Sequence, residues 1–152
     1  MQKSNFKIIL FEPEIPQNTG NIVRLCACTG ADLYLVGKLG FSLAEKHLKR
    51  AGLDYWDDVN IKHVNTLDEV INENPDSNVF YLTTKAKEFY TDKTFKNGDL
   101  LVFGPESRGL PKEIVENENN NRIKIPMVEG KRSLNLSNSV AIVLYEAIRQ
   151  NY

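Results

Sequence analysis

The sequence predicts a single α/β domain with a mostly parallel sheet of about six strands and helices on both faces. Short apolar runs rich in Ile, Val, Leu and Phe alternate along the chain with stretches of helical periodicity. The runs are bounded by Gly, Pro, Asn or Asp, which are typical of strand ends. The 152 residues contain no repeat or linker, so one domain is expected over residues 1–152.

Six short apolar segments are expected to be strands, because they combine β-favouring residues with turn residues at both ends. They are Phe6–Phe11, Asp32–Val36, Ile61–Val64, Asn78–Thr83, Asp99–Phe103 and Arg122–Ile125.

Five segments are expected to be helices. Gly30 is a suitable residue to end the first, Ser42 and Thr66 open capping-box patterns, and Ser137 is the expected N-cap of the last. The segments are Asn18–Thr29, Ser42–Ala51, Thr66–Asn72, Pro111–Glu116 and Ser137–Gln150.

Composition excludes several classes of protein. No stretch approaches the ~20 apolar residues of a membrane span, and the apolar run at Phe6–Phe11 is too short for a secretory signal. We therefore expect a cytoplasmic protein with no membrane partner. A net charge of −1 and a pI near 6.1 argue against indiscriminate nucleic-acid binding, but they leave RNA binding through a local basic patch open.

No metal site or disulfide is expected. Cys26 and Cys28 would lie about 200° apart on a helix, and His47 and His63 are isolated in the sequence. The chain also lacks the glycine-rich fingerprints of dinucleotide-binding and P-loop proteins.

Three loops follow predicted strands and carry unusual chemistry: Glu12–Asn21, Gly104–Pro111 and Pro126–Asn138. Parallel sheets bind ligands beyond the carboxyl ends of their strands, so we expect one shared site rather than three unrelated turns. The alternative for the second loop is an ordinary turn closed by a Glu106–Arg108 pair, and for the third a long capping loop.

Two groups of basic residues allow either a functional or a structural interpretation. Arg24 shares the polar side of its helix with Asn21, where it is placed to meet a phosphate or simply to be solvated. Lys46, Lys49 and Arg50 share one face of the second helix, which is either a solvated face or a surface that tracks phosphates.

Three motifs in order resemble those of the SPOUT class of RNA methyltransferases: Asn18–Arg24, Phe103–Pro111 and Arg132–Ala141. Within that class the chain is most similar to the small enzymes that methylate the wobble ribose of tRNA, at cytidine or modified uridine. Further matching segments are Leu10–Pro16, Arg50–Tyr55, Leu82–Lys85 and Tyr145–Ala147. One departure is Ile148, where those enzymes carry Trp, and we expect it to affect packing rather than chemistry.

The resemblance implies a C-terminal trefoil knot, S-adenosylmethionine as methyl donor, and a homodimer with its active site at the subunit interface. The core and its dimer partner would themselves hold the anticodon stem-loop of tRNA. The positions matched to donor contacts are Leu82, Gly104, Ile125 and Ser133, with Met127 and Leu134 nearby.

For catalysis, the resemblance puts Arg24 near the 2′-hydroxyl. A guanidinium normally stays protonated, so a positioning role that offsets charge on the developing alkoxide is favoured over a role as base. Tyr145 is a second candidate, able to relay the proton once deprotonated, and Arg149 could hold a phosphate. Asn21 and Glu106 are expected to orient these groups, and Asn135 is a further candidate for that role.

Two other functions remain open at this point. One is a SPOUT 2′-O-methyltransferase for another tRNA or rRNA nucleotide. The other is a non-catalytic nucleotide- or RNA-binding module on a similar sheet.

Overall fold

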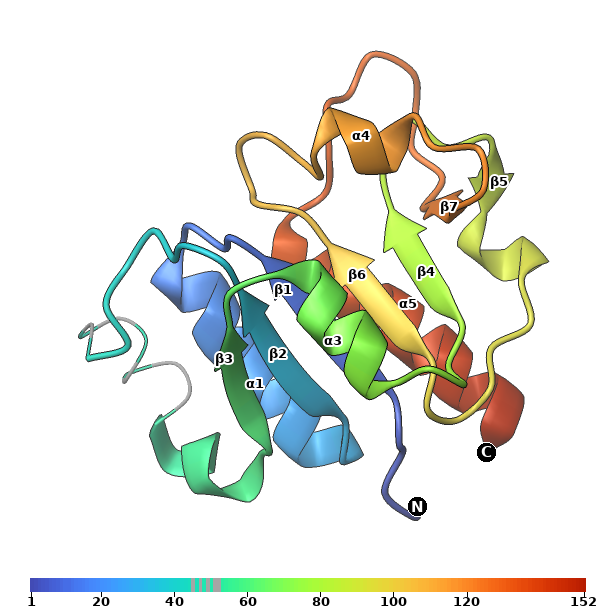
Figure 1. The fold of residues 1–152 in the computed structure, drawn as a ribbon. Coiled ribbons are helices and arrows are strands. Elements are labelled where there is room, and N and C mark those ends of the chain that lie inside the picture. The colour runs from blue at the N-terminus through green and yellow to red at the C-terminus, as the bar shows by residue number, and fades with distance from the viewer. Residues whose placement is uncertain (45, 47, 49, 51–52) are drawn as a thin grey trace.

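A computed structural model describes residues 1–44, 46, 48, 50 and 53–152 (Figure 1). Over these residues, seven parallel strands form one sheet in the order β3-β2-β1-β6-β4-β7-β5. The strands are β1 (Lys7–Phe11), β2 (Asp32–Val36), β3 (Ile61–Val64), β4 (Val79–Leu82), β5 (Glu88–Phe89), β6 (Leu100–Phe103) and β7 (Asn121–Lys124). The predicted α/β class is confirmed. The additional strand, β5, has two residues, too few to give a periodic signal.

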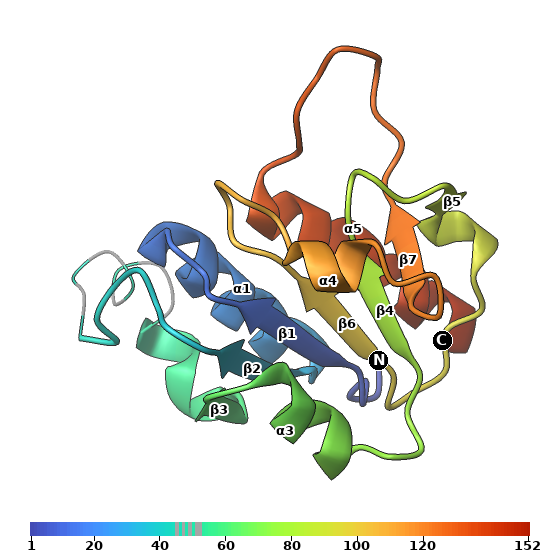
Figure 2. The ribbon, with the colours of Figure 1, turned by 45° about the horizontal axis from the view of Figure 1, so that its top comes forward.

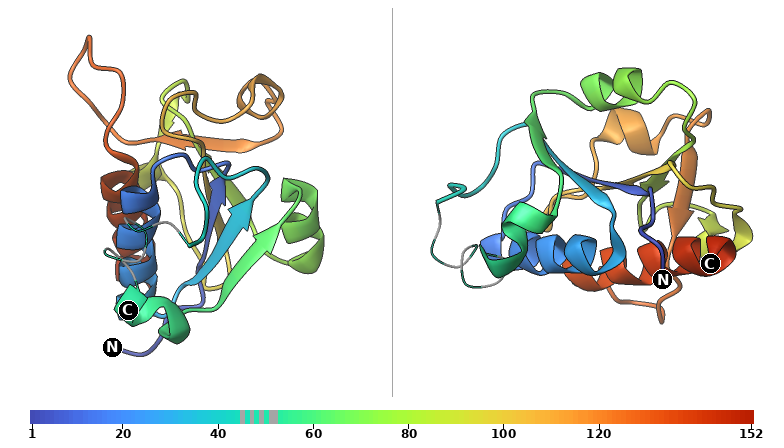
Figure 3. Two further views of the ribbon diagram at one scale, coloured as in Figure 1. Left: turned by 90° about the vertical axis from the view of Figure 1, so that its left-hand side faces the viewer. Right: turned by 90° about the horizontal axis from the view of Figure 1, so that it is seen from below.

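Helices cover both faces of the sheet, as predicted. Figure 3 shows α1 (Pro16–Thr29) and α5 (Leu136–Asn151) against one face, with α3 (Leu67–Glu73) and α4 (Lys112–Val115) on the other. Two short 3₁₀ helices, η1 (Leu53–Asp58) and η2 (Tyr90–Asp92), complete the elements. The predicted helix Ser42–Ala51 lies partly outside the described residues. No described helix is both long and apolar enough to cross a membrane.

Each face of the sheet has its own apolar core. Ile8 and Leu10 of β1 point into the core beneath α1 and α5, and Ile9 points into the core beneath α3. All three are at most 1% exposed. Because successive side chains of a strand alternate between faces, a strand buried on both sides is apolar throughout, which is why β1 and β6 were recognisable.

The starts of α1 and α5, the two helices nearest the site, differ from the prediction. Helix α1 begins at Pro16, two residues before the predicted start at Asn18, because the proline ring fixes φ at a helical value. The N-cap of α5 is Asn135 and not Ser137: the Asn135 side chain accepts a hydrogen bond from the backbone N–H of Asn138 at 3.3 Å. Strand β7 also lies one residue earlier than predicted.

Strand β7 lies between β4 and β5, although it follows both in the chain. Ile123 of β7 is in register with Leu82 on one side and with Glu88 on the other, so residues 83–87 cross one face of β7. The chain then leaves β7 in a long loop that projects beyond the carboxyl ends of the strands and returns to α5 (Figure 2). The trefoil knot that the family resemblance implies stays a prediction.

Candidate active site

One cavity of about 610 Å³ lies at the carboxyl end of the sheet. Loops that follow β4, β6 and β7 form its walls, and the start of α1 contributes Ile15 and Asn18. The structure therefore brings together the three loops that the sequence singled out. All six residues predicted to contact a methyl donor line this cavity: Leu82, Gly104, Ile125, Met127, Ser133 and Leu134.

The chemistry of the walls fits a metabolite with an apolar part and a polar part. Leu82, Phe103 and Ile125 provide apolar surface, while Asn18 and Thr83 provide amide and hydroxyl groups. Pockets for such ligands are typically about 300–1,000 Å³ and mostly apolar, with a few polar groups. A nucleoside joined to an amino acid, as in S-adenosylmethionine, meets both conditions of size and chemistry.

Gly104 allows the loop after β6 to fold back on itself. A Cβ at this position would overlap the backbone nitrogen of Leu110 and the carbonyl carbon of Gly109. Gly109 itself has a φ of 69°, a left-handed conformation that favours glycine. The two glycines hence determine the shape of the cavity wall.

Reciprocal hydrogen bonds join the loop after β1 to the loop after β6. The Glu14 carboxylate accepts bonds from the backbone N–H of Ser107 at 2.8 Å and from the Ser107 hydroxyl at 2.9 Å. These bonds hold the pKa of Glu14 below its usual value. In return, the Glu106 carboxylate accepts bonds from the backbone N–H groups of Glu14 at 2.7 Å and Ile15 at 3.3 Å.

Glu106 lines the cavity and binds the backbone at the start of α1, and its role in orienting the catalytic groups stays a prediction. The expected alternative, a turn closed by a Glu106–Arg108 pair, is not what the structure shows, because Arg108 pairs with Glu12 at 3.3 Å.

Sequence reasoning missed Asn18 as a site residue. It lines the cavity, is 5% exposed, and accepts a hydrogen bond through its side-chain oxygen from the Asn135 amide at 3.1 Å. Asn135 in turn caps α5, so the starts of α1 and α5 are linked at the cavity. The signals that could have revealed Asn18 are its place in the first of the three loops and at the start of the first matched motif.

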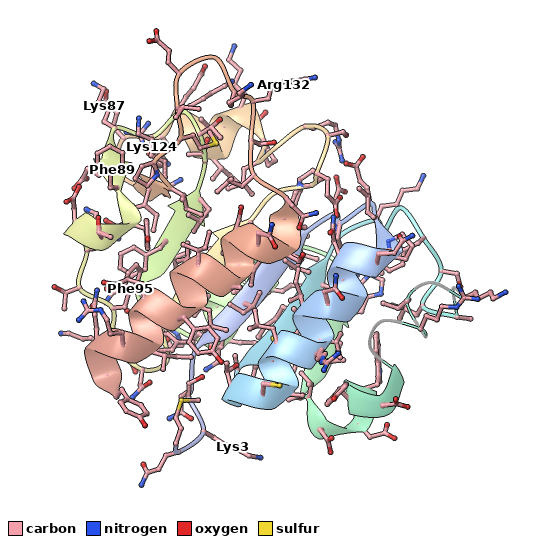
Figure 4. The ribbon with its side chains drawn as sticks, turned by 180° about the vertical axis from the view of Figure 1, so that it is seen from behind. Lys3, Lys87, Phe89, Phe95, Lys124 and Arg132 are labelled. Carbon is pink, nitrogen blue, oxygen red and sulfur yellow. The ribbon has the colours of Figure 1, made fainter. Side chains whose placement is uncertain are left out.

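The predicted catalytic residues Asn21, Arg24 and Tyr145 lie on exposed surfaces of α1 and α5, helices that pack side by side (Figure 4). None is among the described residues that line the cavity of the same subunit. The Arg24 guanidinium lies 5.3 Å from the centre of the Tyr55 ring, and Tyr145 is 48% exposed. A single subunit therefore does not bring these groups to the cavity.

The predicted RNA-binding residues are dispersed. Lys46 and Arg50 are exposed, and Lys49 lies outside the described residues. Arg149 donates two hydrogen bonds to Glu146, at 2.8 and 2.9 Å, and this bonding lowers the pKa of Glu146. This ion pair offsets the positive charge of Arg149, on which its predicted binding to an RNA phosphate relied.

The cysteines do not form a joint site. Cys26 is buried against the core, and burial raises the pKa of its thiol to about 12, whereas Cys28 is exposed. Over the described residues, no group of three or more His, Cys, Asp or Glu side chains could hold a metal ion.

Comparisons with known proteins identify the family. Residues 5–145 match the model of the SpoU rRNA Methylase family. The tRNA (cytidine(34)-2′-O)-methyltransferase of Methylovorus glucosotrophus is 50% identical over 147 residues, which cover 96% of this chain and 96% of that protein.

Two solved structures extend the likeness. One, concerned with the 2-OH methylation of C/U34 on tRNA, has a TM-score of 0.91 and 40% identity and covers 97% of both chains. Another is an AdoMet-bound rRNA methyltransferase from Sinorhizobium meliloti, with a TM-score of 0.86 and 25% identity over 99% of this chain and 58% of that one. With the strand order and the cavity described above, these matches establish that the chain belongs to the SpoU rRNA methylase family.

Proposed function

We propose that this protein transfers a methyl group from S-adenosylmethionine to the ribose 2′-oxygen of nucleotide 34, a cytidine or modified uridine, in the anticodon loop of tRNA. The observation that carries this proposal is the 50% identity, over nearly the full length of both chains, to a relative named for that reaction. A tRNA substrate also implies a cytoplasmic protein.

The donor would occupy the cavity at the carboxyl end of the sheet. Its contacts would be Leu82, Gly104, Ile125 and Ser133, with Met127 and Leu134 beside them, because these residues line the cavity together. When bound, S-adenosylmethionine supplies a methyl group activated by its sulfonium. No metal is proposed to take part.

The chain's own residues would align the acceptor and manage its proton. Arg24 would hold the phosphate beside the target ribose and offset negative charge on the 2′-oxygen, an effect worth a few kcal/mol in comparable sites. Tyr145, once its phenol is deprotonated, would relay the hydroxyl proton. Asn21 would orient Arg24, from which it is separated by one helical turn.

We further propose a homodimer in which each active site combines the cavity of one subunit with Arg24 of the partner subunit. Two observations support it. Arg24 and Tyr145 are exposed on α1 and α5 and do not line their own subunit's cavity. On the same helix α5, Ile142 and Tyr145 are 37% and 48% exposed, apolar surface that a second copy would cover.

The basic residues Lys46, Lys49 and Arg50 remain candidates for contacts with tRNA phosphates, and Arg149 is a weaker candidate because of its pair with Glu146. Positive charge near the active site would hold the anticodon stem-loop through its backbone.

A different nucleotide, in tRNA or rRNA, is the second candidate substrate. It is favoured by the family's description and by the rRNA methyltransferase among the solved relatives. A non-catalytic binding module has less support, because the relatives described above are all methyltransferases.

Mass spectrometry of RNA after incubation with the protein and isotopically labelled S-adenosylmethionine tests the proposal. Total tRNA and ribosomal RNA are offered together, and labelled 2′-O-methylnucleotides are mapped by nuclease digestion. We expect label at nucleotide 34 of a subset of tRNAs. Label at another position, or only in ribosomal RNA, would select the second candidate.

A further inference from the structure

An aromatic ring is exposed at the edge of the sheet, one strand beyond the cavity. Phe89 on β5 is 37% exposed, and its residue is in register with Lys124 of β7. The Lys124 ammonium lies 5.3 Å from the centre of the Phe89 ring, so it covers one part of the ring while another part faces solvent. The ring thus offers an open aromatic face next to a cation, a combination on which an unpaired base can stack.

The segment that carries Phe89 is held firmly. The backbone N–H of Phe89 donates to the Asp92 carboxylate at 3.0 Å, and buried Phe95 packs against Phe80 with ring centres 4.7 Å apart. Gln150 of α5 accepts a hydrogen bond from the Phe95 N–H at 2.7 Å and donates one to the Lys93 carbonyl at 3.0 Å. The ring is therefore presented on a preorganised backbone, which lowers the entropic cost of binding.

Positive charge surrounds the ring and reaches the cavity. Lys87, Lys124 and Arg132 form no ion pair with any described carboxylate, and Figure 4 shows Lys87 and Lys124 beside Phe89, with Arg132 on the neighbouring loop. Lys124 and Arg132 also line the cavity.

Fewer acidic groups lie near the ring. Glu88 is neutralised by Lys93 at 2.9 Å, which leaves Asp92, bonded to the Phe89 N–H, and Glu129, on the same loop as Arg132. A local excess of cations in a chain of net charge −1 indicates a surface for an anionic partner.

We propose that Lys87, Phe89, Lys124 and Arg132, named here the Phe89 surface, bind a single-stranded segment of the substrate RNA. An unpaired base stacks on the open part of the Phe89 ring, and the three cations bind the flanking phosphates. An aromatic platform within a basic groove is the usual means of binding unpaired nucleotides. Lys124 and Arg132 belong to both this surface and the cavity lining, so the bound nucleotide lies beside the cavity and is distinct from the one that is methylated.

The inference rests on the proposed function, because it takes the RNA to be the methylation substrate. Two variants test it without disturbing the cavity: Phe89→Ala removes the ring and Lys87→Ala removes a cation that does not line the cavity. The dissociation constant for unmethylated tRNA is measured by fluorescence anisotropy at several salt concentrations, and that for S-adenosylmethionine by calorimetry. Controls are Lys3→Ala, at the opposite end of the molecule (Figure 4), and Tyr152→Ala, another exposed aromatic residue.

We expect Phe89→Ala to weaken tRNA binding roughly 5- to 100-fold with an unchanged salt dependence, because base stacking is mostly non-ionic. Phe89→Trp should restore binding, since indole also stacks. Lys87→Ala should reduce the slope of log affinity against log salt by about 0.7, the value for one phosphate contact on a single strand. Neither variant should change donor affinity, and neither control should change tRNA affinity.

If Phe89→Ala binds tRNA as tightly as the wild type does and still labels nucleotide 34, RNA binding by the Phe89 surface is rejected. The proposed function is then unaffected. Conversely, if the wild-type protein labels RNA at a nucleotide other than 34 and Phe89→Ala weakens binding of that RNA, the surface is supported and nucleotide 34 is rejected as the target.

Discussion

Glu14 and Ser107, 93 positions apart in the chain, are joined by two hydrogen bonds to one carboxylate, from the Ser107 N–H at 2.8 Å and its hydroxyl at 2.9 Å. Ser107 belongs to the loop that Gly104 begins, and that loop lines the cavity. Together with the bonds that Glu106 accepts from Glu14 and Ile15, this contact couples the start of α1 to the proposed donor site.

Glu14→Ala should therefore weaken donor binding without unfolding the protein. Loss of two charge-assisted hydrogen bonds near the surface costs about 1 kcal/mol after solvent screening, or about 5-fold in affinity. Calorimetric titration with S-adenosylmethionine measures this change in donor affinity. Ser107→Ala, which keeps the backbone bond, is the matched control and should have a smaller effect. Equal affinities in wild type and Glu14→Ala would show that the two loops are held independently of this contact.

The same carboxylate predicts a pH dependence. The pKa of Glu14 is lowered from 4.5 in the folded protein, chiefly by the Ser107 N–H. The stabilisation it provides is therefore present above pH 4.5 and lost as the pH falls through the lower folded-state pKa. The melting temperatures of wild type and Glu14→Gln should differ near neutral pH and converge in acid. A difference that stays constant down to about pH 3 would contradict this assignment.

Gly104→Ala should abolish donor binding, because the added methyl group overlaps backbone atoms of Gly109 and Leu110 that cannot move independently. Gly109→Ala is the informative comparison: nothing lies within 4 Å of its Cβ position, so only the left-handed φ is penalised. We expect a loss of stability of about 1 kcal/mol for Gly109→Ala and a larger loss for Gly104→Ala. Denaturant unfolding measures the stability of the two variants, and calorimetry measures their donor binding. A larger loss of stability in Gly109→Ala than in Gly104→Ala would contradict this geometry of the turn.

Asn135→Ala should destabilise α5 more than Ser137→Ala. Asn135 accepts the hydrogen bond from the Asn138 N–H and also contacts Asn18, whereas the Ser137 hydroxyl bonds only to the Asn135 side chain, at 2.6 Å. Removal of an N-cap typically costs about 1 kcal/mol. Chemical denaturation measures the loss of stability in each variant. A larger loss in Ser137→Ala would show that Ser137 is the N-cap, as expected from the sequence.

Arg24→Ala should abolish tRNA methylation while donor affinity stays within a few-fold of wild type, because Arg24 does not line the cavity of its own subunit. If Arg24 acts on the cavity of the partner subunit, co-expression of Arg24→Ala with Gly104→Ala rebuilds one complete site in each mixed dimer. Random pairing then restores about a quarter of wild-type activity. No restoration in purified mixed dimers would place Arg24 and the cavity in the same subunit, and near-full turnover by Arg24→Ala alone would exclude a catalytic role.

The sequence predicted the layers of the fold because burial on both faces leaves a continuous apolar pattern in strands such as Leu100–Phe103. It could not predict β5, whose two residues carry no period, nor the insertion of β7 between β4 and β5, which is a property of the chain path. Ser137 was a reasonable N-cap by residue type, but the first turn of α5 starts earlier at Leu136 and leaves that role to Asn135.

Local chemistry predicted where the site lies, and the family resemblance predicted its individual residues. Glycine, proline and polar residues identified the three loops, and their position after parallel strands predicted a common cavity. The contact between Glu14 and Ser107 depends on how two distant loops meet, so no local pattern records it. The catalytic role of Arg24 was predicted from the resemblance. The structure of a single chain does not show whether Arg24 acts on the cavity of its own subunit or of the partner subunit.

A crystal structure of the protein with S-adenosylhomocysteine, the product of the donor, is the decisive test of the proposed donor site and of the shared active site. We predict that the ligand lies in the cavity at the carboxyl end of the sheet, against Leu82, Gly104, Ile125 and Ser133, with Arg24 of the partner subunit facing its sulfur. Ligand bound at another surface, or a cavity that stays empty at saturating concentrations, would contradict it.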